Sequence, residues 1–359
     1  MKNSWRVGLN WLCAAFAFFL VCAGIGWFFP KEVNGITLKT QRFAVKKDQF
    51  DIVFIGSSRI YHGVSPKVFD RLMRASGHNW RSFNAAMDGM NTAEGFALAR
   101  RLLSLHPKKL KFIFLELQAY INAGTPIGDE TVKERDVYWR DWDSLVEGFR
   151  KFTLGLTGKG AGLPGIPFSF QRFDRFAPVL LADTRLWVRN LTNFGEGLRI
   201  VQSALASGPS WLRPAAPLQP AKGANLPKNW DGYFAMSRPM SNATLATYRK
   251  GFSDAQHHPP FRPPDPIMRS ELQHFVVEMK RYGIEVIFLV PPSVGGARGS
   301  AFYAPKSDLL FDYDDLTRYA PYYAEPNRLD TEHLNGRGAE LFTRTLADDF
   351  TQALALRPR

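Results

Sequence analysis

The chain has 359 residues, of which 45% are apolar and 14% aromatic, so it can bury a sizeable core and is not expected to be disordered. Lysine and arginine outnumber aspartate and glutamate by 46 to 33, which favours anionic partners such as lipid headgroups, acidic glycans or nucleic acid. No dense Lys/Arg run or RNA-binding aromatic motif accompanies this charge, so nucleic acid is not the expected partner.

Residues 7–29 form an uncharged and mostly apolar run of about the roughly 20 residues that a helix needs to cross a bilayer. Lys2 and Arg6 precede this run, as they do in a signal anchor whose N-terminus stays in the cytoplasm. The main alternative is a cleaved signal peptide, but no convincing small-residue cleavage site is present. We therefore predict a transmembrane signal anchor over residues 1–29, in the inner (cytoplasmic) membrane, with an extracytoplasmic, periplasmic domain behind it.

Both cysteines, Cys13 and Cys22, lie inside the apolar run, so the rest of the chain can form no disulfide and no thiolate metal site. His257 and His258 are adjacent, but they lack the further spaced ligands that a zinc site requires. We expect neither a metal nor another cofactor.

Residues 30–50 are predicted to be a polar tether, after which the pattern becomes α/β. Short apolar runs predict parallel strands buried on both faces, and helices with capping signals separate them. The predicted strands are residues 51–56, 81–86, 111–117 and 284–290, and the predicted helices are residues 66–76, 92–106, 266–282 and 336–355. Regularity is lost at about residues 120–264, which we interpret as an insertion or cap within one domain over residues 51–359. This alternation predicts a three-layer α/β/α fold with a mostly parallel sheet.

Ser57 and Ser58 directly follow the first predicted strand, at the carboxyl end where open parallel sheets bind ligands. A serine hydroxyl is a weak nucleophile unless a base takes its proton and a third group orients the base. Three of the 7 histidines have an acid three residues earlier, so spacing alone does not choose among them. His333, preceded by Asp330, is the one in a loop that leads directly into the last predicted helix.

Gly56, Ser57 and Ser58 at the strand tip, together with the run DTEH that ends at His333, resemble the SGNH/GDSL hydrolase superfamily. Its envelope-associated branch includes polysaccharide O-acetyltransferases and the D-alanyl transfer protein of lipoteichoic acid assembly. The resemblance implies an SGNH-like (flavodoxin-like) fold, with Ser58 as nucleophile, His333 as base and Asp330 as orienting acid. Ser57 is the alternative nucleophile.

The resemblance also implies an oxyanion hole made by the backbone amide of Ser58, by Gly89 and by a third group after the third strand. At that third position the family has an asparagine, whereas this chain has Gln118, whose amide would have to donate instead. Arg59 and Tyr61 are candidate substrate contacts, although Arg59 equally suits an ion pair with a carboxylate.

The expected function is therefore that of a membrane-anchored serine O-acyltransferase or esterase. It would act on a cell-envelope polysaccharide through an acyl-enzyme, with a membrane-bound O-acyltransferase as the expected partner. The alternative is a catalytically inactive SGNH-like scaffold or binding component of a polysaccharide export or modification machine. The altered third block favours this alternative, and serines that only close a strand-to-helix turn would suit it.

Overall fold

The computed structural model describes residues 4–28, 35–118, 230–258, 266–295, 299–305 and 309–356, together with the single positions 146, 149, 181 and 184. The chain divides into two compact units. The N-terminal helix belongs to one of them, and the sheet with its covering helices belongs to the other.

The N-terminal apolar run forms helix α1 (Ser4–Phe28). Within the described part of the chain, this is the one helix long and apolar enough to cross a membrane. A membrane anchor and a signal sequence share these properties. The apolar helix is thus confirmed, while its retention as an anchor and its orientation stay predictions.

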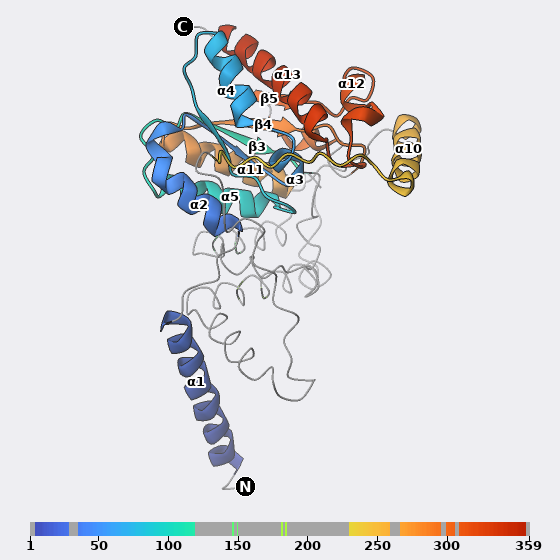
Figure 1. Cartoon of the computed structure of the whole chain (residues 1–359). Helices are drawn as coiled ribbons and strands as arrows, with labels where there is room; N and C mark the ends of the chain where they lie inside the picture. The colour runs from blue at the N-terminus through green and yellow to red at the C-terminus, as the bar shows by residue number, and fades with distance from the viewer. Residues whose placement is uncertain are drawn as a thin grey trace, which may run out of the picture. The chain divides into compact units, whose positions relative to one another are not determined.

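A parallel sheet with strand order β2-β1-β3-β4-β5 lies at the centre of the other unit (Figure 1). Its strands are β1 (Ile52–Ile55), β2 (Ser82–Asn84), β3 (Phe112–Glu116), β4 (Glu285–Val290) and β5 (Leu309–Asp312). The first four coincide with the predicted strands, which confirms the α/β class and the parallel sheet. β5 was not predicted, because this half-buried edge strand is too short to show a period.

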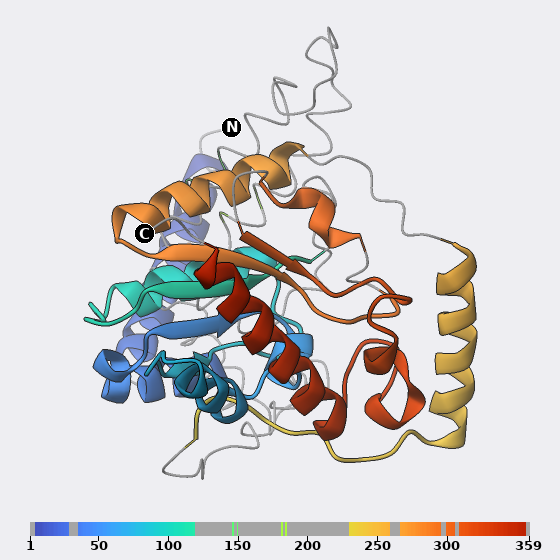
Figure 2. The ribbon, with the colours of Figure 1, turned by 90° about the horizontal axis from the view of Figure 1, so that it is seen from above.

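Helices cover both faces of the sheet. Side chains alternate along β1, so that Val53 and Ile55 face one hydrophobic core while Ile52 and Phe54 face the other. The first core is covered by α2 (Gly35–Lys46), α5 (Thr92–Leu103) and α11 (Pro266–Arg281), and the second by α4 (Pro66–Ala75) and α13 (Gly336–Ala355). Figure 2 looks down on α13 where it lies over the strands. The result is the three-layer arrangement that the alternating pattern predicts.

The structure differs from the polar tether predicted over residues 30–50, because residues from Gly35 onward fold as α2. Ile36 and Phe43 of this helix are buried in the first core, and Phe43 stacks on Phe50 with ring centroids 5.6 Å apart. Since these few apolar side chains stand among lysines and other polar residues, the segment reads as polar although one face of it is buried.

Part of the predicted insertion is described, and it contains α10 (Asn242–His257), which stands at one side of the unit (Figure 2). This helix was missed because only Tyr248 and Ala255 are fully buried, so it shows no continuous apolar face. The segment before it runs along β2, where the Asn84 amide donates to the Asp231 carbonyl oxygen at 2.8 Å. The remainder of the insertion, apart from four single positions, lies outside the described residues.

Candidate active site

The candidate site lies at the carboxyl ends of β1 and β3, where the connections of the sheet diverge. The chain leaves β1 through α4 on one face, and it reaches β3 through α5 on the opposite face. Ligands of open parallel sheets bind at such a switch point, because the loops there separate and leave the strand ends accessible. The loop that precedes α13 reaches the same place and carries His333.

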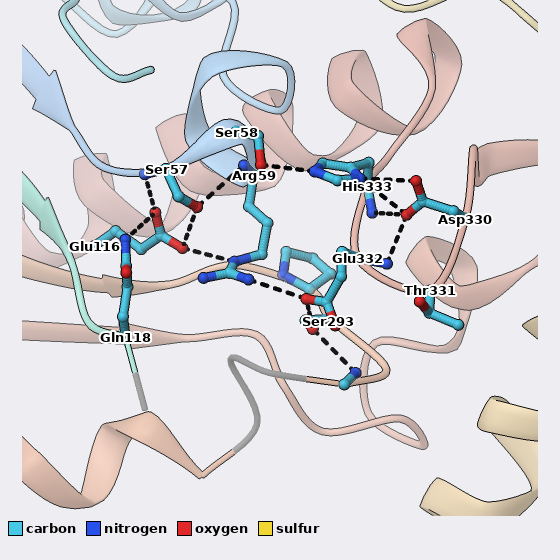
Figure 3. A network of polar contacts seen from close by, with 12 residues as sticks. Ser57, Ser58, Arg59, Glu116, Gln118, Ser293, Asp330, Thr331, Glu332 and His333 are labelled. Atoms are coloured by element: carbon cyan, nitrogen blue, oxygen red, sulfur yellow. Dashed lines mark hydrogen bonds and ion pairs between the residues drawn. The ribbon is translucent and has the colours of Figure 1, made fainter. Parts of the chain in front are cut away.

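Ser57 and Ser58 make different contacts in the turn after β1. Ser57 is the N-cap of α3 (Ser58–Tyr61), and its Oγ accepts a hydrogen bond from the Arg59 amide at 3.3 Å. The Ser57 hydroxyl donates to Glu116 Oε1 at 3.0 Å, whereas the Ser58 hydroxyl is directed to the imidazole of His333 (Figure 3). The Ser57 hydroxyl therefore caps the turn, and the turn directs the Ser58 hydroxyl toward His333.

Ser58, His333 and Asp330 form a continuous hydrogen-bonded chain (Figure 3). His333 Nε2 lies 2.7 Å from Ser58 Oγ, although 275 positions separate the two residues. On the other side of the ring, Nδ1 lies 2.8 Å from Asp330 Oδ2 and 2.9 Å from Oδ1. A carboxylate only accepts hydrogen bonds, so Nδ1 carries the proton and Nε2 is left to accept the proton of the hydroxyl.

Asp330 is kept ionised by its own loop. Burial opposes ionisation, but the imidazole of His333 and the backbone amides of Glu332 and His333, at 2.7 and 2.8 Å, outweigh it and lower the pKa of Asp330 to about 2. A carboxyl group whose pKa falls on folding adds stability that is present above its unfolded pKa and lost as the pH drops through the folded value. Asp330 therefore remains a carboxylate throughout the range in which an imidazole acts as a base.

Glu116, the last residue of β3, holds the turn that carries Ser58. Its side chain is fully buried, and its two oxygens accept hydrogen bonds from the amide and hydroxyl of Ser57 and from Arg59 Nε. The structure thus brings the hydroxyl of Ser57, the alternative candidate nucleophile, to a buried carboxylate, whereas the Ser58 hydroxyl meets His333. A buried carboxylate with several donors is well satisfied and makes a firm anchor.

Arg59 was a candidate substrate contact, but its guanidinium is engaged by two carboxylates. Nε donates to Glu116 Oε1 at 2.7 Å, and Nη1 donates to Glu332 Oε2 at 3.0 Å. Glu332 belongs to the DTEH run and also accepts from Ser293 Oγ at 2.7 Å (Figure 3). The structure thus selects the ion-pair interpretation of Arg59, and it ties the neighbour of Ser58 to the neighbour of His333.

A second buried arginine supports the loop that carries His333. Arg328 is only 1% exposed, and it donates to three backbone carbonyl oxygens, including those of Asp330 at 3.1 Å and Thr331 at 2.6 Å. Its guanidinium also lies 5.8 Å from the ring centroids of both Tyr248 and Tyr323. Because Tyr248 belongs to α10, a helix within the predicted insertion helps to hold the loop that carries Asp330.

Gln118 does not present its amide in the predicted way. Its Nε2 donates to the Met90 carbonyl oxygen at 2.7 Å and to Glu116 Oε2 at 3.4 Å, so both of its N–H groups are directed at protein acceptors. The side chain is buried between β3 and the turn that follows β2, which is why it bonds these groups. In this structure Gln118 therefore supports the turn next to Gly89, and its service as an oxyanion donor, which would require release of one of these hydrogen bonds, stays a prediction.

Gly89 lies in the turn after β2 with a φ of 61°, in the left-handed region that glycine adopts at little cost. Its neighbour Asp88 places this turn beside the triad: Asp88 Oδ1 lies 2.9 Å from His62 Nε2, and the ring centroids of His62 and His333 are 6.2 Å apart. Gly89 is exposed at this end of the sheet, and its service as an oxyanion donor stays a prediction.

Lys39 of α2 brings a buried amine to the same end of the sheet. Its Nζ donates to the carbonyl oxygens of Asn84, at 3.2 Å, and Ala86, and it lies 3.8 Å from the ring centroid of Tyr61. Burial lowers the pKa of Lys39 well below its ordinary value, against the attraction of two aspartates. Tyr61, the other candidate substrate contact, therefore packs on Lys39, and burial raises the pKa of its hydroxyl to about 12.

Among the residues that the structure describes, no three His, Cys, Asp or Glu side chains gather so that they would hold a metal ion. A scan against models of known protein families finds no match to this chain, and a search of curated proteins finds none either. The SGNH-like assignment therefore remains an inference from the two motifs and the geometry around them.

Three residues that hold the site were not singled out in the sequence: Glu116, Glu332 and Arg328. A lone acid at the tip of an apolar strand was the available signal for Glu116, and a second acid within DTEH was the signal for Glu332. Arg328 offered no signal, since an arginine before a loop is ordinarily exposed and only the fold buries it.

Substituting Gly56 with alanine should destabilise the protein. A Cβ at this position would lie 2.5 Å from Glu116 Oε2 and 2.7 Å from Ile60 Cγ1, inside a packed turn. We expect a loss of about 2 kcal/mol in the free energy of unfolding, typical of overpacking, measured by urea denaturation of the full chain in detergent. Gly336→Ala is the control, because its Cβ would meet nothing closer than the Met236 carbonyl oxygen at 3.7 Å. Equal stabilities of the two variants would contradict the predicted clash.

Proposed function

We propose that this protein is a membrane-anchored, SGNH-like serine acyltransferase or esterase that acts on a cell-envelope polysaccharide. The observation that carries the proposal is the hydrogen-bonded chain from Ser58 through His333 to Asp330. His333 Nε2 lies 2.7 Å from Ser58 Oγ, 275 positions away in the sequence, and His333 Nδ1 lies 2.8 Å from Asp330 Oδ2. In this arrangement a serine at a strand tip is hydrogen-bonded to an imidazole, and the other ring nitrogen is hydrogen-bonded to a carboxylate. Such an arrangement activates a serine hydroxyl for nucleophilic attack.

In the proposed reaction, His333 Nε2 takes the proton of Ser58 Oγ as that oxygen attacks the carbonyl carbon of an acyl donor. The amides of Ser58 and Gly89 stabilise the oxyanion, and Asp330 stabilises the imidazolium. The imidazolium then gives its proton to the leaving group, and the acyl group remains as an ester on Ser58. A sugar hydroxyl or water, deprotonated by His333, then attacks the carbonyl carbon of this ester. The bond between that carbon and Ser58 Oγ breaks, the imidazolium returns the proton to Oγ, and the acylated sugar or free acid leaves.

Charge and the apolar helix support the choice of substrate and place. The formal net charge of +13 favours an anionic surface, such as an acidic glycan or lipid headgroups. If α1 is retained as an anchor, the domain stays beside the bilayer, where a membrane-bound O-acyltransferase partner would deliver acyl groups. These features favour transfer to an envelope glycan over hydrolysis of a soluble ester.

The second candidate function is that of a catalytically inactive scaffold. The hydrogen bonds that the Gln118 side-chain amide makes within the protein favour it. An oxyanion donor is typically worth about 10²- to 10³-fold in rate, and the Gln118 amide is committed to Met90 and Glu116. A protein that only binds a glycan or a partner would not need this donor, whereas an enzyme must supply it from another group.

Labelling with a fluorophosphonate probe tests the proposed function. The full chain in detergent should be labelled at Ser58, as located by peptide mass spectrometry, because the activated hydroxyl attacks phosphorus as it would attack a carbonyl carbon. Ser58→Ala should remove the label, whereas Ser57→Ala should keep it at a lower rate, since the N-cap of α3 and the hydroxyl's hydrogen bond to Glu116 are lost but Ser58 is retained. A folded wild-type protein that is not labelled would favour the scaffold, and labelling that persists in Ser58→Ala would remove Ser58 from the role of nucleophile.

A further inference from the structure

We infer that Arg59 is a positioning residue that sets the distance between Ser58 and His333. It stands next to Ser58 in the chain, and its guanidinium reaches across to the loop of the base, a contact between residues 273 positions apart. The expected effect of Arg59 on the reaction rate rests on the proposed function. Its role in positioning Ser58 and His333 rests only on the contacts in the structure.

The helical turn that carries Ser58 is too short to be stable by itself. Helix α3 comprises 4 residues, a single turn, and isolated turns of helix are unstable because nucleation is unfavourable. It is held by Glu116, which accepts from Ser57 and from Arg59 Nε at 2.7 Å. Since Glu116 lies in β3 and pairs in register with Leu289 of β4, the anchor belongs to the centre of the sheet.

The loop that carries His333 is likewise irregular and needs a fixed point. Glu332 provides one, because its Oε2 accepts from Arg59 Nη1 at 3.0 Å and from the buried Ser293 hydroxyl at 2.7 Å. Each end of the bridge is therefore one residue away from a reacting side chain. A shift of about 1 Å between reacting groups can cost about 10²-fold in rate, so a bridge placed here acts directly on the reaction geometry.

An arginine suits this task better than a lysine. The guanidinium presents Nε and Nη1 in a rigid plane, so that one side chain meets the carboxylates of Glu116 and Glu332 in fixed directions. Arg59 and Glu332 are also largely shielded, with side chains 14% and 27% exposed, so the pair is only weakly screened by water. A lysine would keep the charge but would lose the planar fork.

The chain offers a matched control in the ion pair between Arg100 and Glu278. This pair also joins two separate elements, α5 and α11, at 2.8 Å, and its side chains are 17% and 29% exposed. The burial of this pair thus matches that of Arg59 with Glu332. The pair lies in the helical layer, however, and within the part of the chain that the structure describes it makes no contact with Ser58, His333 or Asp330. Loss of the Arg100–Glu278 pair therefore measures how much an ion pair of this burial contributes to the stability of the protein, separately from any effect on the site.

The test compares Arg59→Lys, Glu332→Ala, their double variant and Glu278→Ala, each as full chain in detergent. We expect Arg59→Lys and Glu332→Ala each to lower the second-order rate constant of fluorophosphonate labelling by about 10- to 100-fold, after normalisation to the number of sites that can be labelled. The double variant should be no slower than the slower single variant, since both remove one bridge. Glu278→Ala should stay within about twofold of wild type. Equal rates per labelled site in Glu332→Ala and Glu278→Ala would overturn the inference and leave the proposed function intact.

A second measurement keeps the inference testable if the protein is not an enzyme. With ¹⁵N-labelled histidine, the Nδ1 and Nε2 resonances of His333 report its bonds to Asp330 and Ser58. Arg59→Lys and Glu332→Ala should shift these resonances, and Glu278→Ala should leave them in place. Shifted resonances in a protein that is never labelled at Ser58 would refute the proposed function and uphold the bridge. Unshifted resonances would overturn the bridge whatever the activity.

Discussion

Replacing His333 with alanine is expected to lower the rate of Ser58 labelling by about 10⁴-fold or more, while the protein stays folded. Without the imidazole at 2.7 Å, no group takes the proton of the Ser58 hydroxyl, and at neutral pH a free serine hydroxyl is scarcely nucleophilic. The imidazole side chain is 24% exposed, so its removal leaves no large cavity. The measurement is the time course of labelling at fixed probe concentration, with unfolding monitored in parallel.

His257→Ala provides the control for this prediction. His257 also has an acid three residues earlier, Asp254, and it was a rival to His333 on spacing alone. In the structure it lies exposed at the end of α10, where its Nδ1 is 2.7 Å from the Ser253 carbonyl oxygen. It should label at the wild-type rate. A loss of labelling in His257→Ala, or undiminished labelling in His333→Ala, would remove His333 from the role of base.

Replacing Glu116 with alanine is expected to cause the largest loss of stability of any change in the site, about 3–5 kcal/mol in the free energy of unfolding. The substitution would leave Arg59 Nε and the amide and hydroxyl of Ser57 without the acceptor they share. Buried donors without partners cost their full desolvation energy. The same change would free the turn that carries Ser58, so labelling should slow in the molecules that remain folded. Urea denaturation and labelling of the full chain measure the two effects.

Glu116→Gln separates charge from shape in this prediction. The amide keeps one acceptor oxygen for Ser57 or Arg59 but removes the negative charge that pairs with the guanidinium. We expect it to be less destabilising than Glu116→Ala and more destabilising than Glu278→Ala, whose ion pair is partly exposed. A Glu116→Ala variant as stable as wild type within about 1 kcal/mol would show that this carboxylate does not anchor the turn.

Much of the sheet was predictable from local patterns. β3 and β4 are continuous apolar runs because both faces of a parallel strand are covered, and α5 begins where Asn91 Oδ1 accepts from the Glu94 amide at 2.8 Å, as the capping signal predicts. The same patterns failed for α2 and α10. Both helices bury only a few widely spaced side chains, so neither shows the apolar stripe from which a helix is recognised.

The sequence alone determined the chemical inventory of this protein: an apolar helix at the N-terminus, an α/β chain, two serines at a strand tip, and an acid and a histidine before the last helix. Tertiary structure decided which of these groups meet. Only the fold directs Ser57 to Glu116 and Ser58 to His333, commits Gln118 to Met90, and turns Arg59 into a bridge. The physical reason is that a hydrogen bond depends on tenths of an ångström between groups that lie tens to hundreds of residues apart in the chain, and no local propensity carries that information.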